Sequence, residues 1–253
     1  MPRVARKKSN SGIYHIIMRG INRQTIFEDD EDFKKYIQTL LRYKEICEYE
    51  IYAYCLMDNH LHLLLKEGTE PLDTVMRKIC GSYVFWYNKK YERVGHLFQD
   101  RYKSEPVEND RYFLTVLRYI LHNPRKAGIV TQIHEYKWTN YLEYITEIAY
   151  TDIDFVLNIF NTDRKVAKKR FIDYINEYYD DKCLDIHEKK RLTDDYVREI
   201  INTQYKIENA IDFQGLEPAK RNLYLKDLKK RYGLSIRQIE RVTGINRGII
   251  QRA

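Results

Sequence analysis

The stretch that decides the fold spans residues 51–65 and reads IYAYCLMDNHLHLLL. Apolar and aromatic residues fill both halves, and Asp58-Asn59 separates them. This pattern predicts two strands joined by a two-residue turn.

The second half of this hairpin carries two histidines on one face. Successive side chains of a strand point to opposite sides, so Leu61, Leu63 and Leu65 are expected to face the core. His60 and His62 then share the other face, where two imidazoles can hold one metal ion. The alternative interpretation is a pair of ordinary surface residues, so a second group has to supply the chemistry.

Length and composition predict a globular protein of two units. The chain has 253 residues, 43% of them hydrophobic, and 23 are tyrosines, whose rings suit either base stacking or core edges. The four cysteines (Cys47, Cys55, Cys80 and Cys183) are scattered, without a Cys-x-x-Cys pair. Neither a zinc knuckle nor a disulfide framework is indicated, and a reducing cytoplasm fits.

The first ten residues are basic, but no apolar run follows that would form a signal peptide. No stretch approaches the roughly 20 apolar residues that span a bilayer. We therefore expect a cytoplasmic protein without a membrane partner.

Positive charge is concentrated at the two ends of the chain. The net charge is +7; residues 1–27 hold six basic and no acidic residues, and residues 218–253 hold ten basic against two acidic ones. Such segments attract polyanions, most often nucleic acid. A solvated basic face is the alternative for either end.

The first half of the chain alternates strand and helix patterns. Strands are predicted at 12–19, 51–57, 60–66 and within 95–106, and helices at 28–48, 71–91 and from Asp110 to just before Pro124. The order strand, helix, strand, strand, helix, strand predicts an α+β fold, an antiparallel sheet with helices on one face. Residues 1–150 are expected to form this domain.

The remainder is predicted to be all-helical. Residues 151–217 are charged and helical, as expected of a connector. In residues 218–253, Ser235 has capping-box spacing, Gly244 breaks a helix and Asn246 begins another. This plan is typical of a helix-turn-helix DNA-binding segment. A helical hairpin packed on the main domain is the alternative.

A possible second half of the site lies in the helix that begins at Asp110. Tyr119 and Asn123 are four residues apart and share a helix face. If this helix packs beside the hairpin, Asn123 completes a His-His-amide metal site and Tyr119 reaches a phosphate as the candidate nucleophile. The pairing also arises by chance among so many tyrosines, Asn123 before Pro124 suits a turn, and His122 is a rival third ligand.

Several ordered motifs across residues 10–145 resemble the REP-associated tyrosine transposases, within the HUH single-tyrosine transposases. The motifs are Arg19-Gly20-x-Asn22-Arg23-x-x-Ile26-Phe27, Tyr54-x-x-Met57-x-Asn59-His60-x-His62-x-Leu64, Gly95-x-x-Phe98-Gln99-x-Arg101-Tyr102, Arg118-Tyr119-Ile120-x-x-Asn123-Pro124-x-x-Ala127-Gly128 and Trp138-Thr139-Asn140-Tyr141.

The resemblance implies a ferredoxin-like or RRM-like HUH palm that holds Mg²⁺ or Mn²⁺ on His60, His62 and Asn123. Tyr119 is implied as the nucleophile, which nicks single-stranded DNA at hairpin-forming repeats and transfers strands through a 5′-phosphotyrosine. Related enzymes often have Gln in place of Asn123. Imidazoles alone would favour zinc, copper or nickel, so the choice of ion rests on the resemblance.

The expected partner is single-stranded or hairpin DNA. In residues 77–103, seven basic residues alternate with aromatic ones, a composition that combines stacking with phosphate neutralisation. The residues expected to contact DNA are Arg19, Asn22, Arg23, Arg101, Arg118, Arg237, Arg247 and Arg252. A homodimer is compatible with the sequence.

Two other functions are compatible with the sequence. One is a non-catalytic, sequence-specific DNA-binding regulator that works through the terminal helices. The other is a metallohydrolase that uses His60 and His62, although no Asp or Glu motif supplies further ligands.

Overall fold

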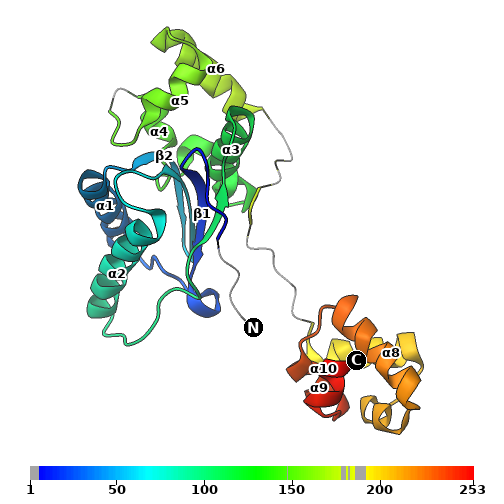
Figure 1. The fold of residues 1–253 in the computed structure, drawn as a ribbon. Helices are drawn as coiled ribbons and strands as arrows, with labels where there is room; N and C mark the ends of the chain where they lie inside the picture. Colours follow the sequence, from blue (N-terminus) through cyan, green and yellow to red (C-terminus); the bar gives the residue numbers. More distant parts are fainter. Residues whose placement is uncertain (1–5, 147, 178–180, 182, 186–191) are drawn as a thin grey trace. The chain divides into compact units, whose positions relative to one another are not determined.

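The computed structural model describes residues 6–146, 148–177, 181, 183–185 and 192–253. The chain divides by its internal contacts into two compact units, Met1–Asp185 and Ile186–Ala253. Each unit has its own hydrophobic core. Figure 1 shows a sheet with surrounding helices in the first unit and helices alone in the second.

The first unit contains a four-stranded antiparallel sheet in the order β2-β3-β1-β4. Its elements are β1 Ile13–Arg19, η1 Ile21–Arg23, α1 Asp30–Cys47, β2 Glu50–Met57, β3 His60–Lys66, α2 Leu72–Lys90, β4 Lys103–Pro106, α3 Asp110–Lys126, η2 Ile133–Glu135, α4 Tyr141–Ile145, α5 Ile153–Phe160 and α6 Arg164–Asn176. The predicted hairpin is confirmed, because β2 and β3 are separated by Asp58 and Asn59 alone.

Helices α1 and α2 cover one face of this sheet. The start of α1 is fixed by a capping box in which the Asp29 side chain accepts from the backbone of Asp32, whose own carboxylate accepts from Asp29. On α2, the Cys80 sulfur lies 3.4 Å from the sulfur of Met18 on β1. Met18 points to the same side as Leu61 opposite it, so this is the leucine face of the hairpin. The predicted α+β, ferredoxin-like arrangement is confirmed.

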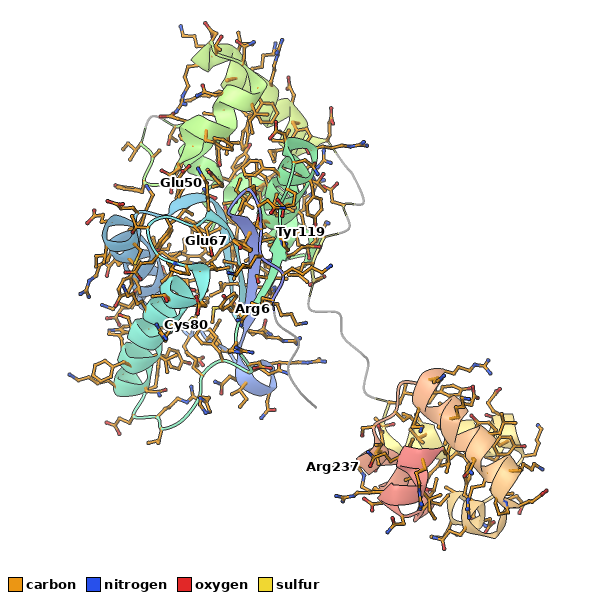
Figure 2. The ribbon with its side chains drawn as sticks, viewed as in Figure 1. Arg6, Glu50, Glu67, Cys80, Tyr119 and Arg237 are labelled. Carbon is orange, nitrogen blue, oxygen red and sulfur yellow. The ribbon has the colours of Figure 1, made fainter. Side chains whose placement is uncertain are left out.

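Helix α3 covers the opposite face, which carries the histidines. The ring of Tyr119 on α3 contacts His62 on β3 and His15 on β1. Asn109, one residue before the predicted cap Asp110, accepts from the backbone N–H of Tyr112. In Figure 2, Cys80 and Tyr119 mark the two sides of the sheet. The sheet is therefore buried on both faces.

Residues 151–217, expected to form a connector, are divided between the two cores instead. Helices α5 and α6 complete the first unit, where Val156 and Phe171 are fully buried and Phe171 stacks on Tyr144 at 4.3 Å between ring centroids. Residues from Val197 to Phe213 belong to the core of the second unit. The charged residues of this segment lie on its outer faces. They obscured the pattern of apolar residues by which each half packs into a different core.

The second unit is all-helical, as predicted, with a fully buried core that includes Phe213, Leu225 and Ile239. Its elements are α7 Asp194–Tyr205, η3 Ala210–Gly215, α8 Pro218–Lys230, α9 Ile236–Thr243 and α10 Arg247–Arg252. Ser235 accepts from the Gln238 backbone N–H, and Asn246 from that of Gly248. These caps fix the starts of α9 and α10 where the sequence indicated.

In the described ranges, no helix combines the length and the apolar composition that crossing a membrane requires.

Candidate active site

The hairpin places His60 and His62 on one face of β3, with 5.3 Å between their ring centroids and the rings nearly perpendicular. His60 is partly buried at the start of the strand, and its Nδ1 lies 2.7 Å from the Asn59 side-chain oxygen. This contact orients the ring from the turn side. His62 lies two residues further along β3 and is fully buried.

His62 has a partner that the sequence did not reveal. Its Nδ1 lies 3.2 Å from Nε2 of His15 on β1, and the two rings are stacked with 5.5 Å between centroids. Its other nitrogen, Nε2, is buried and has no hydrogen-bond partner among the described residues. Only the register of β1 against β3, which pairs Ile17 with His62, could have indicated this contact.

Tyr119 reaches both histidines from α3. Its ring meets His62 edge to face at 5.7 Å between centroids, and His15 at 5.8 Å. Only 6% of Tyr119 is exposed. The Lys126 ammonium lies 4.6 Å from the ring centre, and the phenol hydrogen-bonds to the side chain of Asp185. The structure thus brings the candidate nucleophile and the histidines together.

Burial sets the protonation state of these groups. It lowers the pKa of His15 to about 3 and that of His62 well below its usual 6.5, and it also lowers the pKa of His60. Burial, and then the charge of Asp185, raise the pKa of Tyr119 far above 10. At neutral pH the three imidazoles and the phenol are therefore uncharged.

Asn123, the expected third ligand, hydrogen-bonds within its own helix. Its Nδ2 donates to the carbonyl of Tyr119 at 2.9 Å and that of Ile120 at 3.4 Å. The Ile120 carbonyl would otherwise lack a partner, because Pro124 has no backbone N–H. This compensation explains why α3 continues through Pro124 to Lys126, rather than ending before it as predicted.

The rival third ligand, His122, belongs to a different contact. Its Nε2 lies 2.6 Å from the Ile175 carbonyl on α6, and its side chain is buried. His122 therefore joins α3 to α6, whereas the Tyr119 ring contacts the histidines of the sheet.

The donors present fit a metal ion in part. A buried imidazole nitrogen without a partner, such as Nε2 of His62, is the kind of atom that a metal ion satisfies. Among the described residues, no three His, Cys, Asp or Glu side chains form a metal-binding group. Within the described ranges, a third protein ligand would therefore have to be of another type, and the Oδ1 atom of Asn123 is of that type.

A short segment after α6 lies against α3 and β4. The Asp181 carboxylate accepts two hydrogen bonds from Arg118, at 2.7 and 2.9 Å, and the Leu184 backbone donates to Glu105 at 3.1 Å. Asp185 follows, beside Tyr119. Sequence reasoning missed this carboxylate because it lies 66 residues beyond the tyrosine, outside the motifs.

Arg118 is not presented at a surface. Only 6% of it is exposed, its guanidinium pairs with Asp181, and it lies 4.3 Å above the ring of Tyr174. The expectation that Arg118 contacts DNA is therefore not supported, because these intramolecular partners already occupy its donors.

The other predicted DNA contacts of the first unit lie outside the core. Arg19 ends β1 opposite His60, and Asn22 and Arg23 follow it, exposed and with positive φ. Arg101 is exposed and lines a cavity of about 730 Å³ on the α2 side of the sheet. The described residues that share this cavity with it include Arg6, Arg77, Phe98 and Tyr102.

The three predicted contacts of the second unit are exposed. Arg237 on α9 lines a cavity of about 1250 Å³ together with Lys230, Arg231 and Arg241. Arg247 pairs with Glu240, and Arg252 donates to the Gly248 carbonyl. Figure 2 shows Arg237 at the edge of this unit.

Comparison with known proteins agrees with this geometry. Residues 8–123 match the family described as transposase IS200-like. Over these residues, which make up most of the first unit, the chain is similar to that transposase family.

Two individual proteins show the same kind of similarity. The chain is 24% identical over 115 residues to a protein of Haemophilus influenzae that is provisionally named a REP-associated tyrosine transposase; the match spans 39% of this chain and 64% of that protein. A solved REP-associated tyrosine transposase, bound to a REP hairpin, superposes with a TM-score of 0.50 at 17% identity, covering 60% of this chain and 93% of the other. The resemblance to REP-associated tyrosine transposases is confirmed.

Proposed function

We propose that this protein nicks and rejoins single-stranded DNA at hairpin-forming repeats, with Tyr119 as the nucleophile. The observation that carries the proposal is the contact of the Tyr119 ring with His62, at 5.7 Å between centroids. It joins a phenol and a histidine pair from distant parts of the chain. The similarity to REP-associated tyrosine transposases supports the same reaction.

In the first step, the Tyr119 oxygen attacks a DNA phosphorus atom and the 3′ oxygen leaves. The products are a 5′-phosphotyrosine and a free 3′ hydroxyl. In the second step, the 3′ hydroxyl of another strand attacks the phosphotyrosine and releases the phenol. One phosphodiester is exchanged for another, so no nucleotide fuel is consumed.

The phenol has to lose its proton during attack, since a neutral phenol is a weak nucleophile. Its raised pKa leaves little phenolate at neutral pH. Asp185, which hydrogen-bonds to the phenol, is the group that supports this transfer by accepting the proton. The developing 3′ oxygen takes a proton from solvent in this scheme.

His60 and His62 are the groups that would hold Mg²⁺ or Mn²⁺, with Asn123 as the third ligand. A bound divalent ion supplies charge stabilisation at the phosphate oxygens. The unpartnered Nε2 of His62 supports this assignment. Asn123 can keep its Nδ2 hydrogen bonds within α3 while its Oδ1 serves as a ligand, because the two atoms of the amide act independently.

DNA binding is proposed for both units. In the first, Arg19, Asn22, Arg23 and Arg101 are the contacts, and exposure of the last three supports this role. In the second, α9 and α10 form the proposed helix-turn-helix with Arg237, Arg247 and Arg252. The separate core of this unit supports an independent binding function.

A second candidate is a DNA-binding regulator that has lost catalysis. It is favoured by the 6% exposure of Tyr119 and its contact with Asp185. If the protein is such a regulator, the double variant Arg237→Glu with Arg247→Glu in the full chain should lose all DNA binding. If it is the enzyme, the same double variant should still bind the hairpin through the first unit.

The test is a covalent adduct between the full chain and a single-stranded hairpin oligonucleotide, in Mg²⁺ or Mn²⁺. Tyr119→Phe should abolish the adduct and keep hairpin binding. Tyr112→Phe, on the same helix but hydrogen-bonded to Glu105, is the matched control and should form the adduct. Absence of an adduct in the unaltered protein across hairpins that it binds would contradict the proposal.

A further inference from the structure

His15 on β1 is a buried imidazole that the proposed reaction does not use. It is fully buried, its Nε2 lies 3.2 Å from Nδ1 of His62, and its own Nδ1 has no hydrogen-bond partner among the described residues. A buried polar side chain costs free energy unless hydrogen bonds satisfy its polar atoms, and those of His15 are satisfied only in part. The one hydrogen bond described for its side chain is to the proposed metal ligand His62.

The sheet itself fixes this contact. In the β1–β3 register Ile17 lies opposite His62, and His15 is two residues from Ile17 along β1, on the same face. The rings stack with an interplanar angle of 24°. Both residues belong to paired strands rather than to loops, so the ring of His62 is held against His15 by the backbone hydrogen bonds of the sheet.

The hydrogen bond between the two rings has two arrangements. A neutral imidazole has one N–H donor and one acceptor nitrogen, so a single proton lies between Nε2 of His15 and Nδ1 of His62. With the proton on Nδ1 of His62, its Nε2 carries a free lone pair. With the proton on His15, Nε2 of His62 carries a hydrogen and cannot bind a cation.

We propose that His15 is a positioning residue that accepts a hydrogen bond from Nδ1 of His62 and so directs the Nε2 lone pair of His62 toward a divalent cation. The inference rests on the proposed metal site and deepens it. Histidine ligands commonly donate their second N–H to a neighbouring acceptor, which fixes both tautomer and ring orientation. His15 gives this chain such an acceptor from within the sheet.

The first test is the tautomer of His62 in the metal-free full chain, read from long-range ¹H–¹⁵N NMR correlations. We expect the proton on Nδ1 of His62 in the unaltered protein, and a shift toward Nε2 in His15→Leu. A proton on Nε2 in the unaltered protein would overturn the proposal. This measurement needs neither metal nor activity, and its first part needs no variant.

The second test is Mn²⁺ affinity, measured by electron paramagnetic resonance of the free ion. His15→Leu should weaken binding about 10- to 100-fold, the usual effect of losing such a partner. His15→Gln, whose amide oxygen takes the place of Nε2, should restore most of the affinity. Ile16→Val is the matched control: it is fully buried on the other face of β1 and should leave the affinity unchanged.

The outcomes separate the two proposals. If His62→Ala loses Mn²⁺ binding while His15→Leu retains it in full, the role of His15 is overturned and the metal site stands. If the unaltered protein binds no Mn²⁺, the metal site fails and the role of His15 fails with it. If His15→Leu and His15→Gln weaken binding equally, packing rather than hydrogen bonding is responsible, which also overturns the proposal.

Discussion

The ring of Tyr119 stands edge to face against the ring of His62, with 5.7 Å between centroids and 72° between the planes. The two residues reach each other because α3 covers the histidine face of the sheet while α1 and α2 cover the leucine face. A phenol, two strand histidines and the carboxylate of Asp185 are thus gathered on one side of a rigid sheet.

Acid should destabilise the metal-free first unit. Burial lowers the pKa of His15 to about 3, whereas the unfolded chain titrates near the usual 6.5. Between these values the unfolded state binds more protons, so the free energy of unfolding falls as pH drops, by up to about 1.4 kcal/mol per pH unit for this histidine. Urea unfolding followed by tryptophan fluorescence measures the free energy of unfolding of this unit, because both Trp86 and Trp138 lie in it.

The matched variant is His15→Gln, which cannot titrate in this range. Its stability should fall less between pH 6.5 and 3 than that of the unaltered protein. Parallel pH profiles for the two proteins would contradict the assignment.

Arg118 should matter for stability rather than for DNA affinity. Arg118→Ala leaves the Asp181 carboxylate, 10% exposed, without its bidentate partner, which should cost about 3 kcal/mol of the free energy of unfolding. Replacing both residues, as Arg118→Met with Asp181→Leu, should recover most of this loss. Urea unfolding of the three proteins measures the effect.

The binding measurement on the same variants distinguishes the two roles of Arg118. Loss of a phosphate contact lowers the slope of log affinity against log salt by about one. We expect an unchanged slope for the double variant. A reduced slope would restore Arg118 as a DNA contact.

Gly20 should not tolerate a side chain. A Cβ atom there would lie 2.2 Å from the Gln24 carbonyl oxygen, so Gly20→Ala has to displace the turn that carries Asn22 and Arg23. Hairpin affinity should fall, as measured by fluorescence anisotropy. Gly81→Ala on α2, where a Cβ meets nothing within 4 Å, is the control and should stabilise the protein by about 0.5–1 kcal/mol. Equal affinities for the two variants would contradict this account of the turn.

Asn123 should show two separable roles. Asn123→Asp keeps an oxygen ligand and loses the Nδ2 donor, so it should bind Mn²⁺ but unfold about 1 kcal/mol more easily. Asn123→Ala should lose both the oxygen ligand and the Nδ2 donor, and with them Mn²⁺ affinity and stability. Full Mn²⁺ affinity in Asn123→Ala would limit this residue to supporting α3.

The sequence was sufficient for the parts of the fold that local pattern determines. The two apolar runs within residues 51–65, separated by Asp58 and Asn59, predict the hairpin, and the order of strands and helices predicts a sheet with helices on one face, which α1 and α2 cover. Caps such as Ser235 and Asn246 were also visible, because their hydrogen bonds are local.

Contacts between distant segments were not predictable in this way. The contact of His15 with His62 depends on strand register. The contact of Asp185 with Tyr119 joins residues that lie 66 positions apart in the sequence. The burial of Arg118 depends on Asp181, 63 residues away. The connector was misjudged for the same reason, because the charge of α6 concealed the buried side of Phe171.

The most direct test of the central claim is to identify the tyrosine that carries DNA. The unaltered protein would be incubated with a single-stranded hairpin oligonucleotide and Mn²⁺, digested with nuclease and protease, and analysed by mass spectrometry. We expect a nucleotide linked through its 5′ phosphate to Tyr119 and to none of the other 22 tyrosines. A linkage at a different residue, or cleavage by water with no linked peptide, would contradict it.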